Sequence, residues 1–236
     1  MDKPWLACYE SGVSESVNYP DVPLFQLLTD SATRYPGKNA LSFYGKGVTY
    51  QALEEKTNRF ANGLKKLGVK KGDRVAVMLP NIPQCVIAYF GTLKLGAVAV
   101  MTNPLYIDRE IQVQMADSGA ETIVALDFFY PRIAPILKDT PLKNIILTSV
   151  RDALPWLLSL LYPLKAKREG QWVSIKKEPP IYDMVALMDN ASSASPRETV
   201  RATDLALLQY TGGTTGTPIG VMLSHKNLVA NALQCR

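Results

Sequence analysis

Hydrophobic residues recur along this chain at two alternating spacings, one typical of helices and one typical of buried strands. Helical spacing predicts helices over residues 24–35, 49–67, 83–95, 109–118 and 130–137. Short runs rich in Val, Ile and Ala predict strands over residues 74–79, 97–101, 122–126, 144–148 and 204–210. Strands that alternate with helices of this length are typical of a largely parallel sheet. The fold class predicted from the pattern is therefore α/β, a layered sheet flanked by helices.

A hairpin is predicted ahead of this alternation. Residues 40–44 and 48–50 read as short strands around Gly45, Lys46 and Gly47, where glycine can adopt the positive φ that a tight turn needs. Thr49 suits the N-cap of the helix that follows, and Gly68 suits its C-terminal end.

Residues 151–201 break the alternation. An apolar stretch at 154–164 contains Pro155 and Pro163, and the basic cluster Lys165, Lys167 and Arg168 follows it. The stretch suits the interface between lipid headgroups and acyl chains, whereas a packed hairpin and a solvated basic face are the alternatives. Residues 190–196 read as a linker. We expect an N-terminal α/β subdomain over residues 1–200 and the start of a second, truncated subdomain over residues 201–236.

Composition excludes several classes of protein. The 236 residues are 47% hydrophobic and 20% charged, which excludes a disordered chain, and no apolar run approaches the roughly 20 residues of a spanning helix. The single histidine excludes a His-rich zinc site, and three widely spaced cysteines favour a reducing compartment. The N-terminus lacks the features of a secretory signal, so we expect a cytoplasmic protein. The net charge of +5 comes without a nucleic-acid-binding motif, so no nucleic-acid partner is expected.

The richest segment for chemistry directly follows the last predicted strand. Its glycines allow successive backbone N–H groups to converge on an anion, and its threonines add hydroxyl donors. It has neither the spacing of a Walker A loop nor that of a dinucleotide-binding loop. We expect it to bind phosphate, and the candidate residues are Thr211, Gly212, Gly213, Thr214, Thr215, Gly216, Thr217, Pro218, Ile219 and Gly220.

This loop resembles the phosphate-binding signature of the AMP-forming acyl-CoA synthetases, in particular their long-chain fatty acid branch. Residues 69–81 (VKKGDRVAVMLPN), 95–106 and 222–227 are similar to further segments of the same adenylate-forming family. The resemblance covers essentially the whole chain and implies the N-terminal part of the adenylate-forming ligase fold.

The resemblance also implies a reaction and its ligands. A fatty acid would attack ATP to form an acyl-adenylate, and coenzyme A would then form the thioester. The residues from Thr211 to Gly220 would hold the ATP phosphates, and Thr211 would offer an oxygen to Mg²⁺. Catalytic residues are expected beyond Arg236, so the chain alone should be inactive. Peripheral contact with the inner face of a membrane and a homodimer are left open.

Three alternatives and one departure accompany this interpretation. The parent could act on medium-chain or aryl acids, could stop at the acyl-adenylate, or could be a non-catalytic module that binds phosphate or a partner. Ile219 stands where the family normally has lysine, a cation that can pair with phosphate oxygens. Its loss should weaken nucleotide binding, unless that lysine points to solvent. His225 follows the N-cap candidate Ser224, and we expect it to pack at a helix start rather than to contact substrate.

Overall fold

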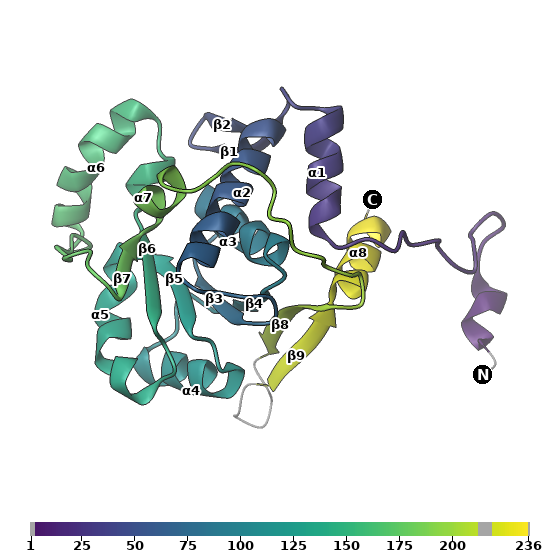
Figure 1. Cartoon of the computed structure of the whole chain (residues 1–236). Coiled ribbons are helices and arrows are strands. Elements are labelled where there is room, and N and C mark those ends of the chain that lie inside the picture. Colours follow the sequence, from purple (N-terminus) through teal and green to yellow (C-terminus); the bar gives the residue numbers. More distant parts are fainter. Residues whose placement is uncertain (1–2, 212–218, 236) are drawn as a thin grey trace.

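A seven-stranded sheet organises the molecule, whose computed structural model describes residues 3–211 and 219–235 (Figure 1). The strand order is β7-β6-β5-β3-β4-β8-β9, and every neighbouring pair is parallel except β8 and β9. The strands are β3 (Arg74–Met78), β4 (Val98–Met101), β5 (Thr122–Leu126), β6 (Asn144–Thr148), β7 (Ile181–Asp183), β8 (Leu205–Thr211) and β9 (Ile219–Ser224). The predicted α/β fold is confirmed.

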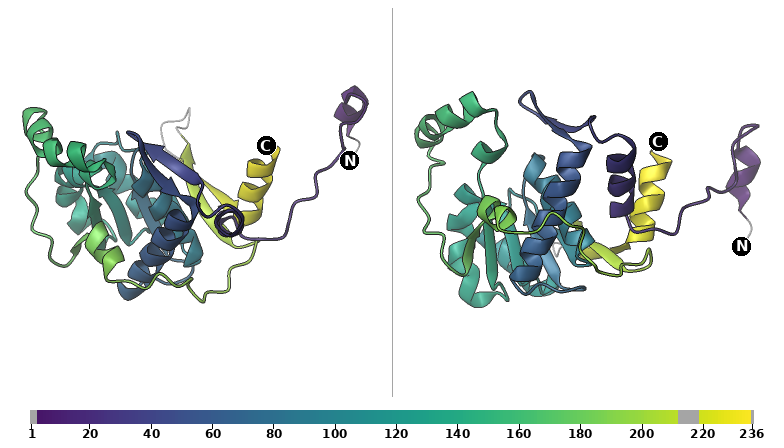
Figure 2. Two further views of the ribbon diagram at one scale, coloured as in Figure 1. Left: turned by 90° about the horizontal axis from the view of Figure 1, so that it is seen from above. Right: turned by 45° about the horizontal axis from the view of Figure 1, so that its top comes forward.

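Helices cover both faces of this sheet. Across the sheet, β4 lies on one side of β3, whereas β5 and β6 lie on the other side. The chain therefore reverses its direction across the sheet after β4, and right-handed crossovers place the connecting helices on opposite faces (Figures 1 and 2). The helices are α1 (Phe25–Arg34), α2 (Tyr50–Lys66), α3 (Pro83–Lys94), α4 (Asp108–Ser118), α5 (Tyr130–Ile133), α6 (Trp156–Arg168), α7 (Met184–Asp189) and α8 (His225–Gln234), with 3₁₀ turns η1 (Pro4–Cys8), η2 (Asp127–Phe129), η3 (Ala134–Asp139) and η4 (Val150–Ala153).

The core lies between the sheet and these helices. The central strands β3, β5 and β6 are buried on both faces, which explains their continuous apolar runs. Helices α2 and α3 pack tightly because Gly91 has no side chain. A Cβ at Gly91 would lie 2.7 Å from Phe60 Cδ1 and 2.9 Å from the Thr57 carbonyl oxygen.

The predicted hairpin forms from β1 (Asn39–Phe43) and β2 (Lys46–Thr49), which pair antiparallel. Its tip uses Gly45 at φ +80° and, unexpectedly, Tyr44 at φ +49°, a region that side chains rarely occupy. Gly47 has no positive φ, and the Asn39 side chain lies where its Cβ would be. Thr49 caps the N-terminus of α2, as predicted: its hydroxyl accepts a hydrogen bond from the Ala52 N–H at 3.2 Å.

Three segments differ from the sequence-based expectation. The predicted helix at 130–137 divides into α5 and the 3₁₀ turn η3 at Pro135, which lacks the N–H that an α-helix uses. The irregular region 151–201 contains α6, β7 and α7, and residues 219–224 form β9. Short strands such as β7 carry too few residues to show a period in the sequence.

The linker predicted at 190–196 lies across α2, and four α2 side chains hold it, one of them Lys66, whose Nζ donates to the Asn190 carbonyl. Asn58 Nδ2 donates to the Ser193 carbonyl at 3.1 Å, and Asn62 Nδ2 donates to the carbonyls of Ser192 and Ala194 at 2.9 and 2.8 Å. The Arg59 guanidinium donates to the Ala191 carbonyl at 2.7 Å. All of these acceptors are backbone oxygens.

Strands β8 and β9 extend the same sheet that β3 to β7 form. The subdomain boundary at residues 200 and 201 stays a prediction. Across residues 3–211 and 219–235, no helix combines the length and the apolar character needed to cross a bilayer.

Candidate functional site

The candidate site starts where β8 ends. Parallel α/β sheets bind ligands beyond the carboxyl ends of their strands, and β8 ends there beside β4, with Gln209 opposite Met101. Thr211 and Ile219 face each other across the β8–β9 pair, and both are exposed. The predicted site residues Gly212, Gly213, Thr214, Thr215, Gly216, Thr217 and Pro218 lie outside the described residues, whereas Thr211, Ile219 and Gly220 lie inside them.

Tyr210 anchors this strand pair to α4. Its phenol donates a short hydrogen bond to the Asp117 carboxylate. Its ring lies against Gly220, where a Cβ would be 3.0 Å from Tyr210 Cζ. Burial raises the pKa of the Tyr210 phenol, and the Asp117 carboxylate raises it further. Tyr210 therefore stays protonated at neutral pH and acts as a fixed donor beside the candidate loop.

The neighbouring strand end is also fixed by α4. Gln114 Nε2 donates to the Met101 carbonyl at 3.1 Å, and Gln114 is almost completely buried. After β4, the Leu105 N–H donates to the Asn103 side chain at 3.0 Å, which closes a turn at Asn103-Pro104. The carboxyl ends of β8 and of its neighbour β4 are thus both held by side chains of α4.

The described residues offer little to a metal ion. No group of three or more His, Cys, Asp or Glu side chains among them is arranged to hold one. Thr211, the predicted Mg²⁺ ligand, is exposed at the end of β8 and could offer one neutral hydroxyl oxygen. Mg²⁺ is usually bound by carboxylates together with substrate phosphates. The Thr211 oxygen therefore fits as a supplementary ligand to a phosphate-bound ion.

His225 lies at the other end of β9 from Ile219. It is fully buried at the start of α8, and its Nδ1 accepts a hydrogen bond from the Leu24 N–H at 3.1 Å. The Ser224 side chain caps the helix by accepting from the Asn227 N–H at 3.3 Å. Burial lowers the pKa of His225 to about 4, so the imidazole is neutral near pH 7. The expected packing role at a helix start is confirmed.

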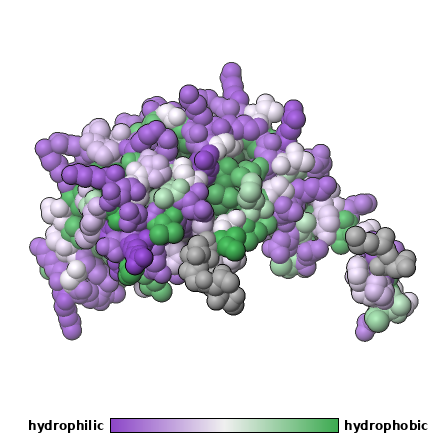
Figure 3. Space-filling view, turned by 90° about the horizontal axis from the view of Figure 1, so that it is seen from below, coloured by the Kyte–Doolittle hydropathy of each residue, from purple (hydrophilic) through white to green (hydrophobic). Residues whose placement is uncertain are grey.

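The side of the molecule next to the candidate loop carries exposed apolar surface. Figure 3 shows apolar residues gathered near the middle of this view. Leu105 and Ile107, which follow β4, and Ile219 and Met222 on β9 are large apolar side chains exposed in the structure. Ile219 has 62% of its surface exposed, so no packing requirement of the described chain explains an isoleucine there.

Sequence reasoning found the loop but missed the residues that support it. Asp117 and Gln114 lie about 90 residues before the loop, and their helix shows only ordinary amphipathic spacing. The one local signal was a tyrosine directly before the glycine-rich loop, because a buried tyrosine hydroxyl needs an acceptor.

Comparison with known proteins gives one consistent answer. The family described as AMP-binding enzyme matches residues 28–236. The long-chain-fatty-acid–CoA ligase of Bacillus subtilis is 40% identical over 99% of this chain and 42% of its own length, and that of Salmonella typhimurium is 37% identical over 100% of this chain and 43% of its own length. The chain thus spans less than half the length of these curated relatives.

Solved structures agree with these relatives. The crystal structure of a long-chain-fatty-acid-CoA ligase (FadD1) from Archaeoglobus fulgidus superposes with a TM-score of 0.74 at 28% identity, and covers 93% of this chain and 40% of its own. An anthranilate CoA ligase crystallised with anthranoyl-AMP shares the fold, with a TM-score of 0.72 at 22% identity over 87% of this chain and 35% of its own.

Proposed function

The chain belongs to the AMP-binding enzyme family, and from that premise we propose that it forms part of a ligase that activates a long-chain fatty acid with ATP. In the first step a carboxylate oxygen attacks the α-phosphorus, and pyrophosphate leaves with the electron pair of the broken P–O bond. In the second step the thiolate of coenzyme A attacks the acyl carbon and AMP leaves. The long-chain acid is preferred because both curated relatives carry that substrate in their names.

The observation that carries this proposal is the Gly/Thr-rich loop at the carboxyl end of β8. Its ends are Thr211 and Ile219, and β8 and the neighbouring strand β4 are fixed to α4 through Tyr210 and Gln114. Backbone N–H groups and hydroxyls in such a loop can share the charge of the β- and γ-phosphates. The role of this chain's residues is therefore to bind and orient pyrophosphate as the leaving group.

Mg²⁺ is the finer part of the proposal. When bound with ATP, it would neutralise phosphate charge, and we infer that the exposed Thr211 would contribute an oxygen to it. Coenzyme A and the acyl-adenylate would be bound with help from parts that the longer relatives have.

The partners follow from the substrate. Long-chain fatty acids partition into bilayers, so peripheral contact with the inner face of a membrane belongs to this proposal. A homodimer, also left open by the sequence, stays a prediction that sedimentation of the chain would test.

The test is pyrophosphate release from ATP in a protein that joins this chain to the downstream region of the Bacillus subtilis ligase. Acids of graded length, assayed with and without coenzyme A, distinguish the long-chain ligase from a medium-chain or aryl ligase and from an acyl-AMP ligase. The proposal expects the highest kcat/KM with long-chain acids and thioester formation only with coenzyme A.

Two controls make the result specific. The downstream region alone should release no pyrophosphate. A Gly213→Pro, Thr214→Ala variant of the joined protein should lose activity while it still unfolds cooperatively. Activity confined to short or aromatic acids contradicts the long-chain proposal, and full activity in the loop variant contradicts the role of the loop.

A further inference from the structure

Helix α6 turns its apolar side away from the protein. Surface helices of globular proteins bury an apolar stripe and expose a polar one. Here Ser159, Tyr162, Pro163 and Ala166 face inward, and Ala166 is the only member of the helix that is fully buried. The outward stripe consists, at helical spacing, of Trp156, Leu157, Leu160, Leu161 and Leu164.

The exposure of this outward stripe is large. Trp156, Leu160 and Leu164 have 79%, 64% and 70% of their surface exposed. Exposed apolar side chains are common singly, but a contiguous group of this size marks an interaction surface. Nothing in the described chain covers it, and it lies beside β6 and β7, at the opposite end of the sheet from β8 and β9 (Figure 1).

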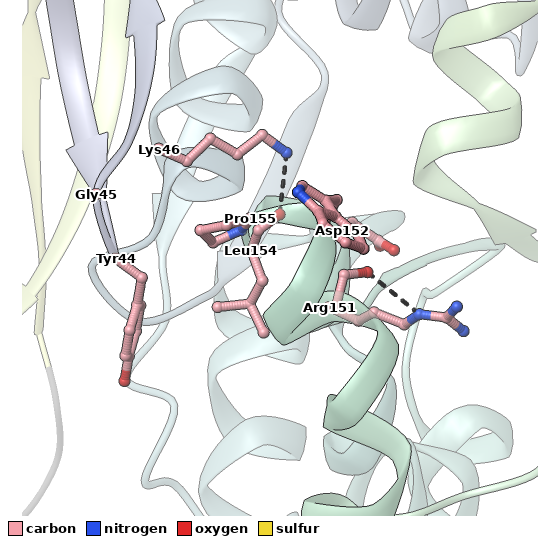
Figure 4. A pocket seen from close by; sticks show the side chains of 9 residues that line it. Tyr44, Gly45, Lys46, Arg151, Asp152, Leu154 and Pro155 are labelled. Carbon is pink, nitrogen blue, oxygen red and sulfur yellow. Dashed lines mark hydrogen bonds between the residues drawn. The ribbon is translucent and has the colours of Figure 1, made fainter.

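The β1–β2 hairpin tip adds an aromatic ring beside the helix. Tyr44 lines an open cleft of about 590 Å³ (Figure 4), and Trp156 lines the same cleft. Tyr44 also lines an apolar groove together with Leu158 and Leu161. Lys46 Nζ ties the hairpin to the start of the helix by donating to the Leu154 carbonyl at 3.1 Å. The positive φ of Tyr44 is the backbone conformation that holds this exposed ring at the tip.

The charges near the helix are mainly positive. Lys165, Lys167 and Arg168 form its last turn, and all three are exposed. Lys167 Nζ lies 5.4 Å from the ring centroid of Trp172, which is itself partly exposed. Exposed tryptophan and leucine beside lysine and arginine match the boundary between acyl chains and anionic headgroups.

We propose that α6 and the hairpin tip together bind the surface of an anionic lipid bilayer. The outward stripe enters the boundary between headgroups and acyl chains, Tyr44 and Trp156 lie at headgroup level, and the basic last turn contacts lipid phosphates. A lipid surface fits better than a protein partner because the patch combines a convex apolar stripe with a basic last turn, in which Lys165 lies 3.9 Å from Glu169 and Lys167 and Arg168 add two further exposed cations. The proposal concerns binding by this chain itself and stands whether or not the proposed ligase activity is correct.

Vesicle flotation of the 236-residue chain tests the proposal. The probes are vesicles of phosphatidylcholine alone and vesicles of equal parts phosphatidylcholine and phosphatidylglycerol. We expect recovery with the anionic vesicles, weaker recovery with the neutral ones, and loss of the difference at high salt, since screening shortens the range of the charges.

Two variants separate the apolar and the charged contributions. Trp156→Ser, Leu160→Ser and Leu164→Ser together should abolish recovery with both kinds of vesicle. Lys165→Glu, Lys167→Glu and Arg168→Glu together should lower the partition coefficient for anionic vesicles on the order of 100-fold, because three cations near the surface are replaced. All six side chains are exposed, so the fold should persist, and the far-ultraviolet circular dichroism spectrum checks it.

Matched controls lie elsewhere on the chain. Leu105→Ser, Ile107→Ser and Met222→Ser remove three exposed apolar side chains away from α6. Lys65→Glu, Lys66→Glu and Lys70→Glu change the net charge by the same amount on exposed residues of another surface. Both controls should leave the partition coefficient for anionic vesicles within about twofold of wild type after correction for net charge.

A spectroscopic readout locates the contact. Trp156 and Trp172 should shift their fluorescence to shorter wavelength on vesicle binding, and Trp156→Phe should remove most of that shift whereas Trp5→Phe should not. Equal recovery of wild type and the Trp156/Leu160/Leu164 variant overturns the proposal. A second outcome also overturns it: the wild-type chain does not float with vesicles but forms a dimer, and the Trp156/Leu160/Leu164 variant disrupts that dimer. The outward stripe of α6 would then bind a second copy of the chain.

Discussion

His225 is the only histidine of the chain, so its titration can be followed without interference. Burial lowers its pKa to about 4, and the nearby Asp204 and Lys71 charges act in opposite directions on it. The unfolded chain therefore binds a proton first as the pH falls from 6.5 toward 4. The stability that neutral His225 provides is complete above pH 6.5 and is lost progressively toward pH 4, by about 3 kcal/mol.

The measurement is the free energy of unfolding in urea across that pH range. A His225→Asn variant keeps an acceptor for the Leu24 N–H but cannot titrate, so its free energy should be less dependent on pH between 6.5 and 4. The pKa values of Asp183 and Asp204 are lowered, away from this window, whereas burial raises the pKa of Asp127 toward it. Asp127 is present in both proteins, so the difference between them reports His225. Identical pH dependence in the two proteins would show that His225 is not held neutral.

Lys94 is a second buried titratable residue. Its ammonium pairs with Glu54 on α2 and donates to Asn58 Oδ1 at 2.7 Å. Burial lowers the pKa of Lys94, and the hydrogen bond and charge of Glu54 oppose that shift. Lys94→Met leaves the Glu54 carboxylate without its cation and should destabilise the fold by about 3–5 kcal/mol.

The double variant Lys94→Met, Glu54→Gln should recover part of that loss, because the unpaired charge is gone. Lys65→Met is the matched control, since Lys65 forms an exposed pair with Glu198 at 2.7 Å and should contribute less than about 1 kcal/mol. Equal effects of Lys94→Met and Lys65→Met in urea unfolding would contradict the buried pair.

Ile219 concerns the candidate site directly. A lysine at its exposed position beside the loop would add a cation near bound phosphate, so Ile219→Lys should raise affinity for ATP on the order of 10- to 100-fold. Isothermal titration of the chain with ATP measures this. Met222→Lys, which adds the same charge on an exposed residue of the same strand, is the control, and no gain in Ile219→Lys over it would remove the phosphate role of position 219.

At the scale of elements, the contact of α2 with α3 depends on one missing side chain. Gly91→Ala places a Cβ within 3 Å of Phe60 and the Thr57 carbonyl, and should cost about 1–3 kcal/mol of unfolding free energy. Gly37→Ala is the control, because nothing lies within 4 Å of its Cβ position. If both changes leave the urea midpoint equal, the two helices are not packed this closely.

Most helices and strands could be predicted from the sequence because the spacing of their hydrophobic residues is clear. The apolar runs of β3, β5 and β6 mark strands buried on both faces, and the stripe of α2 marks a helix packed on one side. Strand order could not be predicted in this way. Strand β8 pairs with β4 rather than with β7, and that choice depends on the crossover geometry of the whole sheet.

For the candidate site, too, one part could be predicted from the sequence and another part could not. Residues of the loop could be identified from composition and order, since glycine and threonine side by side are suited to phosphate. The residues that hold the loop's strand in place could not be predicted, because the Tyr210–Asp117 contact joins residues 93 positions apart and leaves no local pattern in the sequence. Whether the apolar side of α6 faces the core or the solvent could not be predicted, because the spacing of apolar residues in a sequence does not show which way the stripe faces.

At the scale of the whole molecule, the chain spans 42% of the length of its Bacillus subtilis relative. Because the longer relatives extend well past the part that this chain matches, we predict that the purified 236-residue chain makes no acyl-CoA from ATP, fatty acid and coenzyme A. A thioester-specific chromatographic assay checks this, with the Bacillus subtilis ligase as positive control. Product above a blank without protein would contradict the prediction.

The linker at residues 190–196, which lies as a strap across α2, bears on which positions of this protein can change in evolution. Asn58, Arg59 and Asn62 recognise carbonyl oxygens, which every amino acid supplies, and residues 192–195 expose their own side chains. Mutational drift should therefore be tolerated at residues 192–195 and resisted on the helix beneath them. Among related chains, the conserved partner of this contact would be the one that contributes side chains, and the variable partner would be the one that contributes only its backbone.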